Sequence, residues 1–354
     1  MITLRTEAGG RYGIGHAMRL RAIAQALHRL APDVPLQVLG ASPELDTVFD
    51  CCQPWAPVYL GVNHQPHDVL VVDLPQHDGE QDAILLDTQR HTLPLTVVYL
   101  DAPWATSAMC DVLILPGLHH NYSIETLSRC AAAFGPALYY GAAVTVLPAA
   151  LPERMPYTVR QQCLTFYAGG SDPHGLLAQL YAFTRPLVQM LPGVLRCFLR
   201  GRVSPLWPSM TPLLGTDDTM QAFHPWQWAT SSLAIGSWGI TPYECLAAGT
   251  PVLVVPQSAA QAADAARAEI ATRGAIRSLG VLGDTTPEAF SQWIARLWHD
   301  VTTRLDMHRQ SLGRLDRDGS TRIAEILLAS WRHHHERYNH ELSERRYSGG
   351  HMDL

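Results

Sequence analysis

Short apolar runs alternate with amphipathic segments along almost the whole chain. In the first half, apolar runs predict strands over Ile2–Arg5, Leu36–Leu39, Val69–Val72, Thr96–Leu100 and Val112–Leu115. In the second half, the predicted strands lie over Cys163–Tyr167, Leu195–Leu199, Pro212–Leu214, Leu233–Gly236, Val252–Val255 and Ile276–Leu279. Runs of Val, Leu and Ile without polar alternation are typical of parallel strands that are buried on both faces.

The segments between these runs have the spacing of helices. The predicted helices lie over His16–Leu30, Asp78–Gln89, His174–Met190, Asp217–Trp228, Thr241–Ala248, Ala260–Arg273, Pro287–His299 and Thr321–His340. Strands that alternate with helices indicate an α/β fold. The proline-rich stretch 148–156 has no periodicity and is the expected linker. We therefore expect two Rossmann-like, doubly wound domains that face a cleft, over residues 1–147 and 157–318, and a C-terminal helical extension over 319–354.

Composition narrows the class of protein. The chain has 354 residues, of which 47% are hydrophobic and 16% charged, which is enough apolar material for two cores. A formal charge of -6 argues against a nucleic-acid surface, and no apolar stretch is long enough for a membrane span. All 26 basic residues are arginine, so Walker-lysine and Schiff-base chemistry are excluded.

The cysteines and the N-terminus bear on the compartment. Seven cysteines, an odd number without C-x-x-C spacing, predict buried free thiols rather than disulfides or a zinc site. The chain enters a strand pattern directly after Met1, without the pattern of a signal peptide. We therefore expect a cytoplasmic location.

Three glycine-rich loops each join an apolar run to a helix. They are Gly13–His16, Gly169–Pro173 and Gly236–Thr241. A strand that turns on glycine into a helix directs backbone N–H groups and the positive end of the helix dipole towards an anion. Two such loops in one half and a histidine-bearing loop in the other predict an enzyme for a diphosphate-linked substrate.

Each loop also has a simpler structural interpretation. His16 at a helix start can activate a water in its neutral form, or it can pack under the loop. Ser171 or Asp172 can cap a helix that begins at Pro173, whether or not the loop also binds phosphate. Thr241 and Glu244 can contact phosphate and a ribose diol, or they can serve the helix N-terminus.

Taken in order, these segments resemble a known family. The chain resembles the UDP-sugar hydrolases of pseudaminic acid biosynthesis and the related spore-coat polysaccharide proteins, within the MurG-like branch of the GT-B fold. The resemblance covers about residues 1–275 and rests on Arg5, Gly13–Arg19, Val71–Asp73, Leu100–Asp101, Cys110–Asp111, Gly169–Pro173 and Ala234–Pro251.

The resemblance implies a metal-independent, cofactor-free reaction of a UDP-linked amino or deoxy sugar. Water attacks the anomeric carbon, UDP leaves, and His16 matches the family's catalytic histidine. The candidate residues for binding substrate and nucleotide are Arg5, Gly13, Gly15, Asp73, Gly170, Ser171, Gly236, Ser237, Gly239, Thr241, Glu244 and Gln261.

The chain also departs from the family pattern. Ile240 stands where a serine is usual, and Ala260 stands where an asparagine is usual. Two alternatives therefore stay open: a GT-B glycosyltransferase in which His16 deprotonates an acceptor, and a nucleotide-sugar binder without chemistry. The residues do not specify the sugar, the nucleobase or the oligomeric state, and the C-terminal extension lies outside the resemblance.

Overall fold

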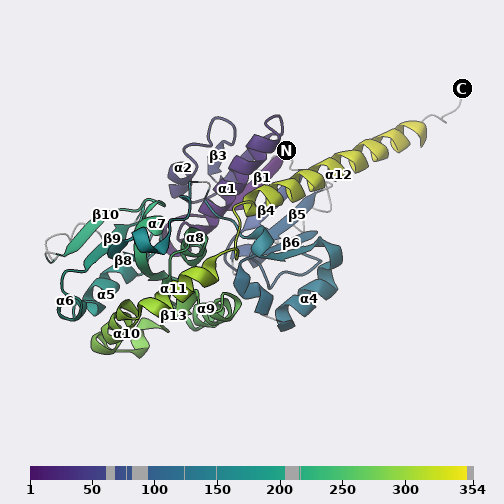
Figure 1. Cartoon of the computed structure of the whole chain (residues 1–354). Coiled ribbons are helices and arrows are strands. Elements are labelled where there is room, and N and C mark those ends of the chain that lie inside the picture. Colours follow the sequence, from purple (N-terminus) through teal and green to yellow (C-terminus); the bar gives the residue numbers. More distant parts are fainter. Residues whose placement is uncertain are drawn as a thin grey trace, which may run out of the picture.

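The fold was analysed in a computed structural model (Figure 1). It describes residues 1–60, 68–76, 78–81, 95–122, 124–148, 150–203, 215 and 217–348. The described chain forms two parallel β-sheets, one built from each half of the sequence, with helices packed on them.

The first sheet has seven parallel strands in the order β3-β2-β1-β4-β5-β6-β7. The strands are β1 (Ile2–Thr6), β2 (Leu36–Gly40), β3 (Val58–Leu60), β4 (Val69–Asp73), β5 (Thr96–Leu100), β6 (Val112–Pro116) and β7 (Leu138–Gly141). The order reverses between β1 and β4, because the chain first winds outward through β2 and β3 and then crosses back. Ligands of open parallel sheets bind outside the carboxyl ends of the strands at such a reversal.

The second sheet repeats this plan with six parallel strands in the order β10-β9-β8-β11-β12-β13. The strands are β8 (Gln161–Tyr167), β9 (Leu195–Arg200), β10 (Asp218–Ala222), β11 (Ser231–Ser237), β12 (Val252–Val255) and β13 (Ile276–Ser278). Here the order reverses between β8 and β11.

Helices bury both faces of the sheets. Those of the first half include α1 (Gly15–Leu30), α2 (Glu44–Val48), the 3-10 helix η2 (Leu118–Tyr122) and α4 (Ile124–Phe134). Those of the second half are α5 (Leu176–Phe183), α6 (Leu187–Met190), α7 (Gln227–Thr230), α8 (Thr241–Ala248), α9 (Ala259–Ala271), α10 (Pro287–His299), α11 (Val301–Ser311) and α12 (Gly319–Ser348). Alternate residues of β4 join two different cores: Val71 packs with α1, and Val72 packs on the opposite face.

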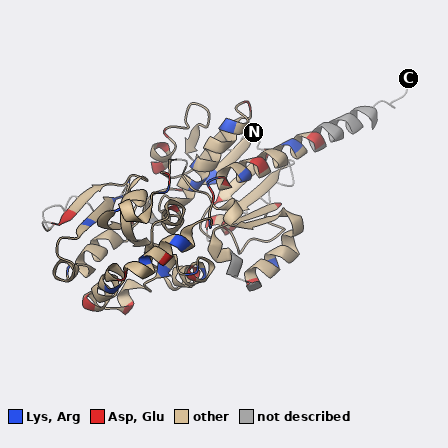
Figure 2. Cartoon of the chain, in the orientation of Figure 1, with Lys and Arg blue, Asp and Glu red and all other residues tan. Residues whose placement is uncertain are grey.

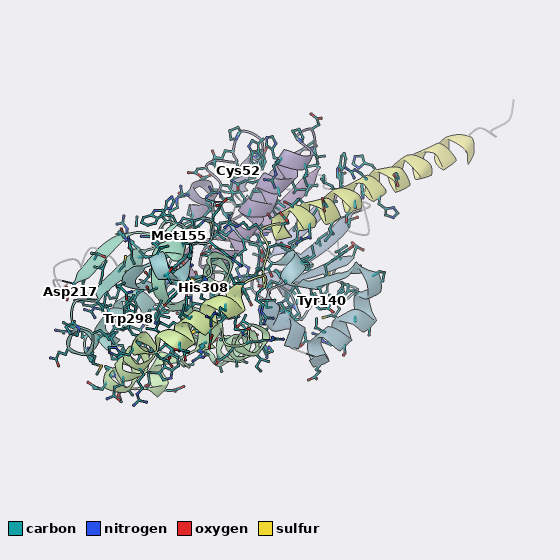
Figure 3. All side chains as sticks on the ribbon, in the orientation of Figure 1. Cys52, Tyr140, Met155, Asp217, Trp298 and His308 are labelled. Atoms are coloured by element: carbon teal, nitrogen blue, oxygen red, sulfur yellow. The ribbon has the colours of Figure 1, made fainter. Side chains whose placement is uncertain are left out.

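Helix α11 closes the second half beside α8. His308 of α11 is labelled in Figure 3, and its Nδ1 lies 2.6 Å from the carbonyl oxygen of Gly249 at the end of α8. Arg304 places its guanidinium 4.6 Å from the ring centroid of Trp298 on α10, which is also labelled there. These contacts tie α10 and α11 to the body of the second sheet.

Helix α12 crosses back to the first half, and its outer end projects from the molecule (Figure 1). Ile323 and Leu327 are fully buried in the core of the first sheet, together with α1. Trp331 donates from its indole N–H to Asp68 (3.0 Å), which also pairs with the N-terminal amine of Met1. The start of the predicted C-terminal extension is therefore part of the first core.

Most of the predicted elements are confirmed, and α8 and α10 have the predicted bounds. Two predicted helices are wrong as whole elements. The segment 217–228 is not one helix, because 218–222 pairs with β9 as edge strand β10, where a buried ion pair joins Asp218 to Arg196 (2.7 Å). The predicted helix over His174–Met190 is two helices, because Pro186 restricts the residue before it and separates α5 from α6.

Other elements were missed or lie outside the described residues. Short strands β3 and β7 and helices α2, α4 and α11 were not predicted. The predicted strand Pro212–Leu214 and residues 82–89 of the predicted helix Asp78–Gln89 lie outside the described residues. The domain boundaries remain a prediction.

The structure also shows the state of the cysteines, the character of the helices and the distribution of charge. None of the seven cysteines is joined in a disulfide bond. No helix in the described part of the chain is both long and apolar enough to cross a bilayer. Basic and acidic residues are interspersed along the ribbon in Figure 2 rather than gathered in one region.

Shortening a buried side chain of α12 tests its membership of the first core. Leu327→Ala is expected to lower the free energy of unfolding by about 2–5 kcal/mol, because it leaves a cavity where the side chain is fully buried. Leu312→Ala is the control, since Leu312 is 50% exposed. Urea denaturation of both variants would compare them. Equal, small effects would show that α12 does not stabilise the first half.

Candidate active site

The first glycine loop lies at the carboxyl end of β1 and leads into α1. Gly9 and Gly13 have positive φ angles of 72° and 68°, which glycine adopts without strain. The amide of Gly9 donates to the carbonyl of Gly13 (2.7 Å), so the loop closes on itself. Helix α1 then starts at Gly15, which places His16 in its first turn with its side chain partly exposed.

Asp73, the last residue of β4, meets His16 at the strand reversal. The Nδ1 atom of His16 lies 2.6 Å from Oδ1 of Asp73, whose carboxylate is fully buried. Arg19, one turn further along α1, donates to the same carboxylate from Nε (2.7 Å) and Nη2 (2.6 Å). Burial acts to raise the pKa of Asp73, but the charges and hydrogen bonds of Arg19 and His16 lower it overall. Asp73 is therefore a carboxylate at neutral pH.

This arrangement selects one tautomer of His16. An ionised carboxylate accepts a hydrogen bond from Nδ1–H, so the proton stays on Nδ1 and Nε2 can accept a proton from a ligand. Nη2 of Arg19 also lies 3.2 Å from Nδ1, but an Nδ1 that donates to Asp73 cannot accept there. Because the contact of Nδ1 with Asp73 is the shorter of the two, we assign the ring proton to Nδ1. His16 and Asp73, both predicted as site residues, are thus arranged as general-base chemistry requires.

The network continues to residues that the sequence analysis did not assign to the site. Arg19 donates from Nη1 to Asp101 (2.8 Å), which follows β5, and Nε2 of His120 lies 3.1 Å from the other oxygen of Asp101. Nδ1 of His119 lies 2.6 Å from the hydroxyl of Tyr243 in α8. Burial and the neighbouring His120 lower the pKa of His119 to about 3, so the ring is neutral. The sequence feature that could have indicated these residues is the pair of adjacent histidines just after β6.

The second glycine loop faces the first. A Cβ atom added to Gly170 would overlap the side chain of Ile14, and one added to Gly13 would lie 3.5 Å from Oγ of Ser171. The predicted helix start at Pro173 is wrong. Asp172 instead accepts from the amides of Leu176 (2.7 Å) and Leu177 (3.0 Å), so it holds the first turn of α5.

The third glycine loop follows β11 and leads into α8. Gly236 has a packing role, because a Cβ there would overlap the carbonyl oxygen of Tyr167 on β8. Ser237 and Thr241 are buried, and Gly239 has a φ of 149°. A Cβ added to Gly169 would lie 3.6 Å from Oγ of Ser237, so the second and third loops adjoin at the reversal of the second sheet.

Glu244 is buried inside α8 with a defined partner. It is 4% exposed, and its Oε2 accepts from the indole N–H of Trp228 (3.0 Å). Burial raises its pKa to about 7, and the indole hydrogen bond offsets only part of that rise. The carboxyl group therefore changes its charge near neutral pH.

Two predicted binding residues have local structural contacts. Arg5 pairs with Glu7, whose carboxylate accepts from the amides of Ala41 and Ser42 (2.9 Å each) and so holds the turn after β2. The side-chain oxygen of Gln261 accepts from the amide of Gln257 (2.9 Å) at the start of α9. These contacts give both residues a structural role.

Comparison with known proteins bears on the fold. No family model and no curated protein matches the sequence. Among solved structures, MurG of Acinetobacter baumannii is 14% identical with a TM-score of 0.60, covering 93% of this chain and 99% of that one. The S. aureus MnaA–UDP structure is 13% identical with a TM-score of 0.61, covering 91% and 95%. A UDP-N-acetylglucosamine 2-epimerase is 14% identical with a TM-score of 0.61, covering 92% and 94%. The fold is GT-B.

The GT-B fold agrees with the two reversed parallel sheets and confirms the predicted fold class. At 13–15% identity the likeness extends to the backbone and not to individual side chains. The residues of this GT-B chain that act on a ligand must therefore be inferred from the geometry of the chain itself.

The raised pKa of Glu244 predicts how stability depends on pH. The folded chain holds this proton at pH values where the unfolded chain has lost it. The contribution of Glu244 to the free energy of unfolding is therefore most favourable below the ordinary pKa of 4.5. This contribution declines as the pH rises to about 7.

Glu244→Gln removes the free-energy cost of ionising a buried carboxyl group, and the glutamine oxygen can still accept the hydrogen bond from the indole of Trp228. We expect it to stabilise the fold at about pH 8, by up to roughly 3 kcal/mol, and to have little effect at about pH 5. Thermal melts across this range would measure the difference. Glu288→Gln is the control, because Glu288 is exposed on α10. A pH-independent effect of Glu244→Gln would contradict the assignment.

Proposed function

We propose that this chain is a nucleotide-sugar enzyme that hydrolyses a UDP-linked amino or deoxy sugar, with His16 as general base. The observation that carries the proposal is the contact of His16 with the buried carboxylate of Asp73 at the strand reversal. Among the structural neighbours, two are titled as complexes with UDP, and others are named as a UDP-N-acetylglucosamine 2-epimerase and as glycosyltransferases. These names support a nucleotide-sugar ligand for the same fold.

In this proposal each half supplies one part of the chemistry. Nε2 of His16 accepts a proton from water while the water oxygen forms a bond to the anomeric carbon. The bond from that carbon to the β-phosphate oxygen breaks, and UDP leaves with the electron pair. The second and third glycine loops, with Gly170, Ser171, Gly239 and Thr241, would offer hydrogen-bond donors to the departing diphosphate.

Three other predicted residues have proposed roles around this centre. Gly13 and Gly15 allow the first loop to approach the ligand closely. Glu244 would bind the ribose diol, which requires its carboxylate to turn from the indole of Trp228 towards the ligand. The fold is shared with transferases and an epimerase, so the reaction must be identified from its products.

The first experiment is product analysis with UDP-, CMP- and GDP-sugars and no acceptor. Release of a nucleoside diphosphate together with free sugar is the expected result. Release that requires an added acceptor would identify a transferase, and a recovered nucleotide sugar with inverted configuration would identify an epimerase. Binding without any turnover would support the binder without chemistry.

His16→Asn is expected to lower turnover by at least about 10²–10⁴-fold, because the base is removed. UDP affinity should be retained, since the side chain of His16 meets water rather than the diphosphate in the proposed mechanism. His28→Asn is the matched control on the same helix, where the ring of His28 stacks on Trp55. Rates and calorimetric UDP affinities would be measured for both variants. If His16→Asn lost UDP binding along with turnover, His16 would be structural.

Asp73→Asn tests the positioning of the histidine separately. The amide cannot replace the charge that fixes the tautomer, so kcat should fall by about 10²-fold or more while KM changes little. Steady-state kinetics with the substrate found above would give both constants. If kcat/KM fell as much through a rise in KM alone, with kcat unchanged, Asp73 would instead act in substrate binding.

A further inference from the structure

A second cluster of polar side chains lies beside the His16–Asp73 pair. It consists of Asp101, His119 and His120, which offer one ligand atom each, all within 4.8 Å of one another. Asp101 follows β5 and has a φ of 55°, which is unusual for a residue other than glycine. The histidines lie on η2, directly after the neighbouring strand β6, and both are buried. The carboxyl ends of two adjacent strands thus bring three metal-binding side chains together.

We propose that Asp101, His119 and His120 form a binding site for a divalent transition metal ion of the zinc class. Two imidazoles and one carboxylate are a ligand set that zinc uses in proteins. Nε2 of His120 and Oδ1 of Asp101 are 3.1 Å apart. Ligand atoms about 2.0–2.1 Å from a tetrahedral zinc ion are separated by about 3.3 Å. The two atoms are hydrogen-bonded in the structure, so an ion would replace the proton between them while they keep nearly the spacing of two ligands of one ion.

Neighbouring groups orient two of these ligands, His119 and Asp101, from the side that faces away from the proposed ion. The Nδ1 edge of His119 faces the hydroxyl of Tyr243 (2.6 Å), which leaves Nε2 of that ring as its metal-binding atom. The second oxygen of Asp101 accepts from Arg19 (2.8 Å), which leaves Oδ1 for the ion. Hydrogen bonds of this kind to the far side of each ligand are characteristic of metal sites and fix the ligand geometry.

The charges nearby are compatible with a cation. Arg19 is the adjacent positive charge, but it is held between the carboxylates of Asp73 and Asp101. Asp264 of α9 interacts electrostatically with Asp101 and His120 and adds a further carboxylate, which is paired with Arg267. Two arginines therefore face three carboxylates, so a divalent ion would meet net negative charge.

Three protein ligands leave a coordination position for water or for an oxygen of a ligand. The site would also lie at a contact between the two halves, because Tyr243 and Trp238 come from the second half. The ring of Trp238 packs edge-on against His119 at 5.4 Å. An ion here would hold η2 in the position that meets α8. This site does not depend on the proposed hydrolysis.

The test is metal binding by the full chain without a histidine tag. After chelation and dialysis, equilibrium dialysis against zinc with elemental analysis should give one tightly bound ion per chain. Cobalt should give the intense visible absorption of a tetrahedral site. Absence of a tight ion in the unaltered chain would overturn the proposal.

Variants locate the ion. His120→Ala and Asp101→Asn should each weaken zinc binding at least about 100-fold, and Tyr243→Phe about 10-fold. Asparagine tolerates the positive φ at position 101, so that variant keeps the backbone conformation. His335→Ala is the control, because His335 and His334 lie 3.7 Å from Asp68 and form a further group of side chains on which zinc could collect. Loss of the tight ion in His335→Ala, with retention in Asp101→Asn, would refute the site.

Discussion

The buried ion pair between Arg19 and Asp73 is the interaction on which the rest of the first half depends. Arg19 comes from α1, while Asp73 and Asp101 end β4 and follow β5, so one guanidinium fixes three elements. Burial alone would lower the pKa of Arg19, but the two carboxylates raise it overall, so the charge is permanent. Removing one partner of such a pair typically costs about 3–5 kcal/mol, because the other charge stays buried. The orientation of His16 is a consequence of this pairing.

The two strand reversals have the same topology and different chemistry. At the first, a glycine loop meets a carboxylate, and an ionisable network extends across three strands. At the second, glycine loops adjoin at Gly169 and Ser237, which are small and uncharged. Backbone amides and helix ends dominate there. The proposed hydrolysis would place proton transfer in the first half and hydrogen-bond donation to a diphosphate in the second half.

The sequence predicted the α/β architecture because fully buried parallel strands leave an unmistakable apolar signal. It also placed His16 among the candidates from the glycine loop after the first strand, and Asp73 from the family resemblance, in which a strand ends in aspartate. It could not place His119 and His120, because their significance depends on the adjacency of β5 and β6 and on Tyr243, which is 124 residues from His119. The edge strand β10 was missed for a related reason. Its residues have no strand periodicity, and its pairing depends on the buried contact of Asp218 with Arg196.

Helix α12 has a consequence for the order in which the chain can fold during synthesis. Ile323 and Leu327 complete the core that begins with Ile2 and Leu4, and Trp331 shares Asp68 with the N-terminal amine. The ribosome therefore releases the first sheet long before the helix that covers it exists. Until α12 emerges, part of an apolar face of that sheet remains uncovered, and nascent chains with such surface are prone to aggregate. The second half, whose strands and helices are contiguous in sequence, can form its core first.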